Sequence, residues 1–165
     1  MEGGYDITYT PQEAMADGAH TITVNVSDND GNAADPATRN ITVDTVAPTL
    51  NVTSPAEGLV TNQTNIAVTG TTNDITSGPV TVTITLNSAD QGAVTVQEDG
   101  AFSKDIVLAE GANVIVVTAT DRAGKSTSVT RNVEVNTTAP KITAVEIVPN
   151  PADAGATYII KVTVE

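Results

Sequence analysis

The clearest structural pattern in this sequence lies at residues 111–124, which read GANVIVVTATDRAG. Apolar side chains stand at every second position, at Ile115, Val117 and Ala119. Such alternation is typical of a β-strand that buries one face. The stretch ends at Gly124, and glycine readily adopts the positive φ that a tight hairpin turn requires. The pattern therefore predicts a half-buried strand followed by a hairpin turn.

The same stretch occurs earlier as GAHTITVNVSDNDG at residues 18–31, a spacing of 93 residues from Gly18 to Gly111. Further on, TRNITVDTVAP at 38–48 matches TRNVEVNTTAP at 130–140, with seven of the eleven positions identical and a spacing of 92. A period of this length corresponds to a whole domain rather than to one unit of a solenoid. The sequence therefore predicts tandem modules.

Alignment of the two copies divides the chain into five segments. We expect residues 1–44 to be the C-terminal half of a first module and 45–48 to be a linker. Residues 49–136 would form a complete module, 137–140 a second linker, and 141–165 the first strands of a following module. Each module would thus have its neighbours in the same chain as partners. Because the outer segments leave strand edges unpaired, we also expect head-to-tail self-association between molecules.

The complete module contains seven runs in which apolar and polar residues alternate, separated by turn residues. Seven short strands with frequent turns predict an all-β fold, an antiparallel β-sandwich of the immunoglobulin type. Lys104 shares the inward parity of Phe102 and Ile106, which predicts a β-bulge or a strand end there. The runs are marked by Leu50 and Val52; Ile66 and Val68; Val80 to Leu86; Val94 and Val96; Phe102 to Leu108; Ile115 to Ala119; and Val133 and Val135.

Composition excludes several classes of function. The formal net charge is -13 with only seven Lys and Arg residues, which argues against nucleic acids and anionic membranes as partners. No run approaches the roughly 18 apolar residues of a membrane span, so no membrane insertion is expected. The absence of cysteine excludes thiol catalysis, and the single histidine, His20, lacks partners for catalysis or zinc binding. We expect no catalytic residues.

Several motifs of the complete module and of the linker after it stand out, namely Gly100, Phe102, Leu108, EGAN at 110–113, TDRAG at 120–124 and TTAP at 137–140. Together they resemble the bacterial immunoglobulin-like (Big) repeats of surface proteins. The resemblance implies an extracellular or cell-surface location and a non-catalytic structural spacer or stalk module, as in adhesins. The motifs also resemble accessory domains of glycan-active enzymes, so a carbohydrate- or ligand-binding accessory module is the alternative, with the ligand unknown.

The hairpin turns carry an aspartate just before each glycine turn, Asp28 in the first copy and Asp121 in the second. Aspartate side chains at such positions accept hydrogen bonds from turn amides. We therefore expect a structural role for both residues.

The joint between the first two modules contains a candidate calcium site. In an immunoglobulin-like sandwich, the last hairpin turn and the turn between the second and third strands lie next to the preceding module. Asp44 in the linker region should then approach Asn73, Asp74 and Asp121. Oxygen ligands of this kind suit calcium, a hard cation. Two alternatives stay open, namely ion pairing with the basic residues of the loop at 121–125 and plain solvation. We expect that no cofactor is required.

Overall fold

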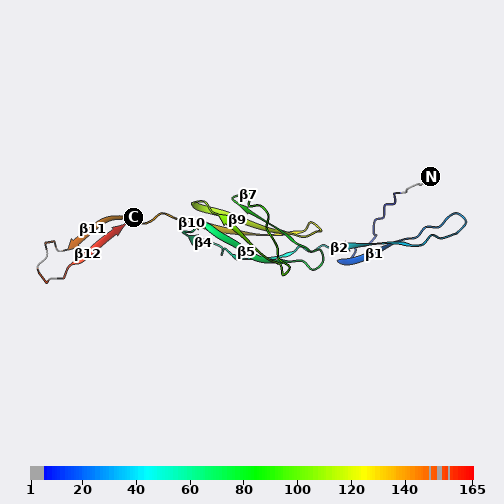
Figure 1. Ribbon diagram of the computed structural model, residues 1–165, viewed down its shortest axis with the longest axis horizontal. Coiled ribbons are helices and arrows are strands. Elements are labelled where there is room, and N and C mark those ends of the chain that lie inside the picture. The colour runs from blue at the N-terminus through cyan, green and yellow to red at the C-terminus, as the bar shows by residue number, and fades with distance from the viewer. Residues whose placement is uncertain (1–5, 149, 152–153, 156) are drawn as a thin grey trace.

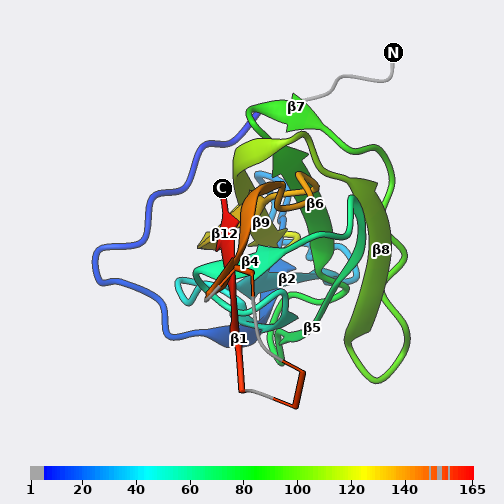
Figure 2. The ribbon, with the colours of Figure 1, turned by 90° about the vertical axis from the view of Figure 1, so that its left-hand side faces the viewer.

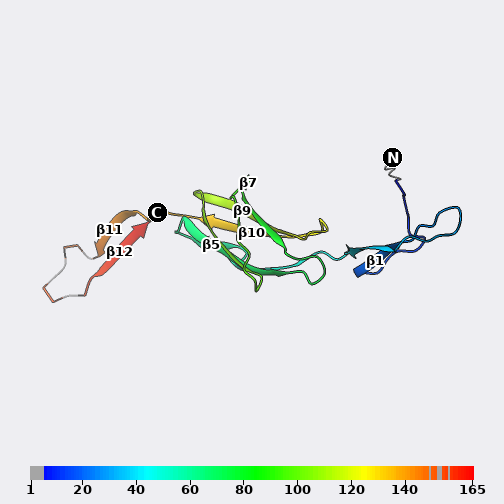
Figure 3. The same ribbon diagram turned by 45° about the vertical axis from the view of Figure 1, so that its right-hand side comes forward.

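The protein is all-β along its described length (Figure 1). The computed structural model describes residues 6–148, 150–151, 154–155 and 157–165. In Figure 1 a hairpin lies at either end of a central sandwich, and Figure 3 shows the same order from another side. The strands in these residues are β1 (Gly18–Val24), β2 (Ala37–Val43), β3 (Thr49–Ser54), β4 (Leu59–Thr61), β5 (Asn65–Asn73), β6 (Thr81–Leu86), β7 (Ala89–Asp90), β8 (Ala101–Val107), β9 (Gly111–Thr120), β10 (Ser126–Val135), β11 (Ile142–Val148) and β12 (Ile159–Val164).

The central sandwich has two sheets, one in the order β4-β10-β9-β6-β7 and the other in the order β3-β5-β8. All its pairs are antiparallel except the short parallel pair of β4 with β10, where Leu59 lies opposite Val133. The chain turns between β3 and β4 and changes sheets there, so β4 runs beside β10 in the same direction. This arrangement confirms the predicted immunoglobulin-like β-sandwich.

The core lies between the two sheets and consists mainly of branched aliphatic side chains. Ile84, Ile115 and Val117 on one sheet and Val68 on the other have no exposed surface. This burial confirms the alternation predicted for these strands, since the residues between them, such as Thr83 and Val116, are more exposed. Branched side chains suit such a pleated, half-buried surface.

The single phenylalanine of the chain packs over a glycine. Phe102 on β8 is 3% exposed and lies opposite Gly70 on β5. A Cβ atom at Gly70 would lie 2.6 Å from the Phe102 ring and 2.3 Å from the Asn51 carbonyl oxygen. The space for this ring therefore depends on glycine at position 70.

The predicted strand at Val94 and Val96 is wrong. Only an isolated bridge from Val96 to Phe102 forms there. This segment leaves β7 at the edge of one sheet and enters β8 at the edge of the other, and Figure 2 shows both strands at the periphery. A chain that crosses between sheets cannot pair with either along its length. Both valines are half-buried and pack against the core, which explains their alternation.

The expected bulge or strand end at Lys104 is also wrong. The register of β5 with β8 runs without a shift from Asn65 opposite Val107 to Thr71 opposite Ala101, and Lys104 lies in the middle of β8. Because β8 is an edge strand, the lysine reaches past the sheet edge, where its Nζ donates a hydrogen bond to the Ala93 carbonyl oxygen at 3.2 Å. The edge position of β8 therefore lets the ammonium group leave the core side of the sheet without a bulge.

The outer hairpins expose apolar side chains. Ile22 and Ile41 of the β1–β2 hairpin are 44% and 37% exposed, and Ile142 and Val162 of the β11–β12 hairpin are 60% and 53% exposed. The β1–β2 hairpin pairs Gly18 with Val43, as β9–β10 pairs Gly111 with Val135. Self-association through these hairpins stays a prediction.

Replacement of Gly100 by alanine should destabilise the sandwich by about 3 kcal/mol. Gly100 has φ of 83° and a Cβ there would lie 2.0 Å from the Thr72 carbonyl oxygen, whereas a Cβ at Gly124 would meet nothing within 4 Å. Gly124→Ala, at φ of 82°, should therefore cost only the backbone strain of about 1 kcal/mol. Urea unfolding of the two variants measures the difference, and equal losses would contradict the close contact at Gly100.

Candidate metal centre

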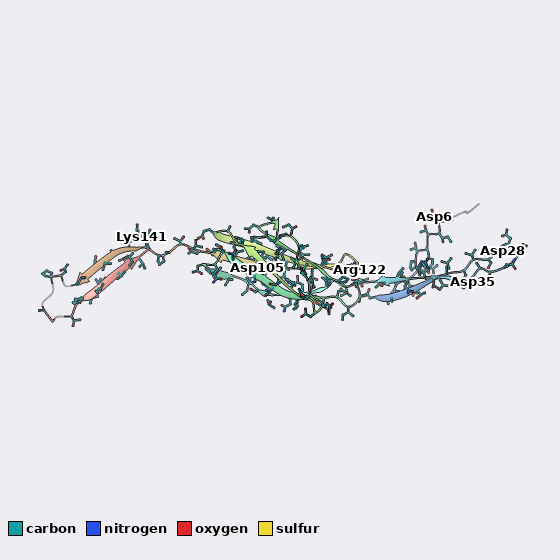
Figure 4. All side chains as sticks on the ribbon, in the orientation of Figure 1. Asp6, Asp28, Asp35, Asp105, Arg122 and Lys141 are labelled. Carbon is teal, nitrogen blue, oxygen red and sulfur yellow. The ribbon has the colours of Figure 1, made fainter. Side chains whose placement is uncertain are left out.

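Three carboxylates meet at the end of the sandwich that faces the β1–β2 hairpin. Asp44 follows β2, Asp74 follows β5, and Asp121 follows β9. Each offers one oxygen to a group in which all three atoms lie within 4.8 Å of one another. The label of Arg122 in Figure 4, one residue after Asp121, marks this end of the sandwich. Three separate segments of the chain therefore bring negative charge to one point.

Asp44 is held by hydrogen bonds from the junction and from the loop between β5 and β6. It is 8% exposed, and its Oδ1 accepts a hydrogen bond from the Val46 amide at 3.0 Å. Its Oδ2 accepts a hydrogen bond from the Ser77 hydroxyl in the loop between β5 and β6. The carboxylate thus bridges the junction and the sandwich.

Asp74 begins the loop after β5 with a turn closed by its own side chain. Its Oδ1 accepts hydrogen bonds from the amides of Thr76 at 2.8 Å and Ser77 at 2.7 Å. Aspartate commonly caps turns in this way. Ser77 contacts both carboxylates, because its amide donates to Asp74 and its hydroxyl donates to Asp44.

Asp121 closes the hairpin turn between β9 and β10, as the sequence predicted. Its Oδ1 accepts a hydrogen bond from the Lys125 amide at 2.9 Å. The equivalent Asp28 likewise accepts from the amide of Asn32 at 2.8 Å and from that of Asp30 at 3.0 Å. The expected structural role of both aspartates is confirmed.

The second oxygens of these two aspartates differ in environment. The Asn32 side-chain amide donates to Asp28 Oδ2 at 2.8 Å, and this bond is the largest cause of the lowered pKa of Asp28. The position equivalent to Asn32 is Lys125, which is exposed. Asp121 is 6% exposed, and within the described part of the chain its Oδ2 is buried without a hydrogen-bond partner. Such an oxygen carries a large desolvation cost.

The basic residues of the loop lie near the cluster without neutralising it. Arg122 donates its backbone amide to the Ser77 carbonyl oxygen at 3.1 Å, and it lines a cavity of about 290 Å³ together with Asp44 and Ser77. The hydrogen bonds that the described residues donate to the three carboxylates all come from neutral amide or hydroxyl groups. The cavity leaves room beside Asp44 for water molecules.

Asn73, the fourth expected ligand, stays a prediction. It is the exposed last residue of β5, and its backbone carbonyl oxygen accepts a hydrogen bond from the Thr49 hydroxyl. Together with Asp74 it lines a second cavity, of about 480 Å³. Ser77, by contrast, was not expected at the site. The only signal for it is a hydroxyl residue three positions after Asp74, a common turn pattern that carries little information about metal binding.

His20 takes part in a structural contact that recurs in the other copy. Its Nε2 donates a hydrogen bond to the Ala16 carbonyl oxygen at 2.7 Å. The equivalent Asn113 donates from Nδ2 to the Ala109 carbonyl oxygen at 2.8 Å. His20 therefore fastens the segment that enters the β1–β2 hairpin, and Asn113 fastens the segment that enters the β9–β10 hairpin.

The two sheets and the hairpin turn define the class of this protein as an immunoglobulin-like module. Residues 2–45 match the family model described as a bacterial Ig-like domain. Residues 48–137, more than half of the chain, match the model described as glucodextranase, domain B. The chain therefore belongs to the glucodextranase domain B family. Immunoglobulin-like modules of this kind are found in cell-surface and secreted proteins.

Two further proteins are similar to this chain. Bacillopeptidase F of Bacillus subtilis (strain 168) is 32% identical over 127 residues, which are 76% of this chain and 8% of that protein. The chain thus corresponds to a small part of that relative. The solved fibronectin(III)-like modules of Clostridium thermocellum CbhA are 19% identical, with a TM-score of 0.48 over 74% of this chain and 64% of that one. In the described residues, no helix is long and apolar enough to cross a membrane.

Replacement of Asp121 by asparagine should stabilise the metal-free sandwich by about 1–2 kcal/mol. The substitution replaces a buried carboxylate by a neutral amide, which removes repulsion from Asp44 and Asp74 and supplies a donor toward them. Asp28→Asn, at the equivalent exposed turn, should leave the unfolding of the sandwich unchanged. Thermal unfolding in the presence of a chelator tests both variants. A clear destabilisation by Asp121→Asn would show that the free oxygen is not a source of strain.

Proposed function

We propose that this chain is a non-catalytic spacer module of an extracellular or cell-surface bacterial protein. The observation that carries the proposal is the short junction at residues 44–48, which is fastened directly to the sandwich. Pro48 is buried and its carbonyl oxygen accepts a hydrogen bond from the Thr127 hydroxyl at 2.6 Å. Together with the contact between Asp44 and Ser77, this bond holds the junction at two points. Such a junction transmits orientation from one module to the next.

A second polar contact recurs at both junctions of the chain. Asp17 accepts hydrogen bonds from the amide of Thr45 at 2.8 Å and from its hydroxyl at 3.0 Å. Glu110 accepts the corresponding bonds from Thr137 at 3.1 Å and 2.8 Å. In each case a carboxylate before the last hairpin holds the threonine that starts the linker. A repeated fastening of this kind supports a structural role in module spacing.

The alternative is a carbohydrate- or ligand-binding accessory module, which the description of the family favours. The larger cavity, of about 480 Å³, is lined by aliphatic, polar and acidic residues and by no aromatic side chain. The one phenylalanine is buried in the core. Sugar-binding sites usually use exposed aromatic rings as platforms. The spacer therefore accounts better for the surface of the sandwich.

Small-angle X-ray scattering of the purified chain tests the spacer role. We expect an extended particle whose maximum dimension becomes shorter and more broadly distributed when residues 44–48 are replaced by a glycine-serine linker of equal length. Circular dichroism of the variant controls for folding of the sandwich. Identical scattering of the two proteins would overturn the spacer role, and saturable binding of the parent chain to immobilised glucan would favour the accessory module.

A further inference from the structure

We propose that the cluster of Asp44, Asp74 and Asp121 binds one calcium ion that fastens the junction to the sandwich. This inference rests on the proposed spacer function and names the regulation of its joint. The cluster by itself shows only that three carboxylate oxygens lie within 4.8 Å of one another. The buried, unpartnered Oδ2 of Asp121 is the independent observation that points to a ligand.

The internal repeat shows that the free oxygen is a specific feature of this turn. In the first copy, Asn32 caps the second oxygen of Asp28. In the second copy Lys125 stands at the equivalent position and leaves Asp121 Oδ2 uncapped within the described residues. A buried carboxylate oxygen that receives no hydrogen bond from the protein is satisfied by a cation or by ordered water.

The first junction, at residues 44–48, also differs in charge from the second, at residues 136–140. Asp44 at the first junction aligns with Asn136 at the second. Both side chains accept a hydrogen bond at 3.0 Å from the amide two residues later, Asp44 from Val46 and Asn136 from Thr138. An asparagine therefore forms this turn equally well. The carboxylate at the first junction adds a negative charge that the turn itself does not require.

The chemistry of the cluster suits calcium better than other metals. Its donors are carboxylate oxygens, whereas zinc and copper sites use histidine or cysteine. Calcium accepts six to eight oxygen ligands in flexible geometry, and the adjoining cavity of about 290 Å³ has room for water to complete the shell. Magnesium demands a stricter octahedron and retains its water, so three carboxylates from three separate segments suit it less.

The position of the ligands determines what the ion would do. Asp44 belongs to the junction, Asp74 to the loop between β5 and β6, and Asp121 to the hairpin turn between β9 and β10. One bound ion would replace the repulsion among these carboxylates by attraction and link the junction to both loops. Ser77 already joins Asp44 to Asp74, so part of the site is preorganised. Calcium would thus bind at the junction on which the spacer function depends, and it would control the stiffness of that junction.

The charged groups around the site set the competition that calcium must overcome. The Arg122 side chain lies at the cavity, and Lys125 is exposed in the same turn. We therefore expect moderate affinity, with a dissociation constant on the order of 0.1 mM, in the range of extracellular calcium modules.

Isothermal titration calorimetry and thermal unfolding of the whole chain test the proposal. We expect one calcium per chain and a rise in melting temperature with calcium concentration. Asp121→Asn and Asp44→Asn should each weaken binding by roughly tenfold or more, because each removes a charged ligand. Asp28→Asn, at the equivalent turn of the first copy, is the matched control and should bind as the parent does.

Three results would overturn the proposal. They are the absence of both heat and a melting shift on addition of calcium, unchanged affinity in Asp121→Asn, and tighter binding of magnesium than of calcium. Asparagine forms the same turn at the second junction, at Asn136. The Asp44→Asn variant should therefore fold as the parent does, so a loss of calcium binding in it reports the loss of a ligand. If scattering shows an extended particle but no calcium binds, the proposed spacer function stands and only the calcium site is overturned.

Discussion

The short junction between β2 and β3 is the constraint on which the arrangement at the end of the sandwich depends. Residues 44–48 leave little chain between Val43 and Thr49, and buried Pro48 restricts them further. The hydrogen bond from Thr127 to the Pro48 carbonyl oxygen fixes the far end of the junction. Asp44 therefore lies over the loops of the sandwich, where the Ser77 hydroxyl meets it. A longer linker would not bring this carboxylate to Asp74 and Asp121.

The β1–β2 and β9–β10 hairpins preserve polar contacts as well as apolar positions. His20 and Asn113 differ in type, yet each donates a hydrogen bond to the carbonyl oxygen four residues earlier. Asp17 and Glu110 similarly hold Thr45 and Thr137. These contacts fix where the hairpin starts and where the linker leaves it. The geometry of a joint is thus encoded in a few side chains at the ends of the strands.

Most of the sandwich could be predicted from the alternation of apolar residues, because burial of one face imposes a period of two on each strand. The prediction failed at Val94 and Val96, whose alternation reflects packing of a crossing segment rather than pairing. It also missed β4 and β7, which are three and two residues long and show no period. Lys104 could not be placed because sheet order, which makes β8 an edge strand, is a tertiary property. Three of the four predicted ligands converge because topology alone brings their turns together. The contact of Ser77 and the free oxygen of Asp121 depend on side-chain positions that no sequence pattern reveals.

The central claim is that a cation at the junction holds the β1–β2 hairpin and the sandwich in one orientation. The chain contains no cysteine, so spin labels can be attached at Thr23→Cys on β1 and Thr83→Cys on β6, both exposed positions. Pulsed electron paramagnetic resonance then gives the distribution of distances between them. The account predicts a single narrow distribution with calcium and a clearly broader one in chelator. Distributions of equal width in the two conditions would contradict it.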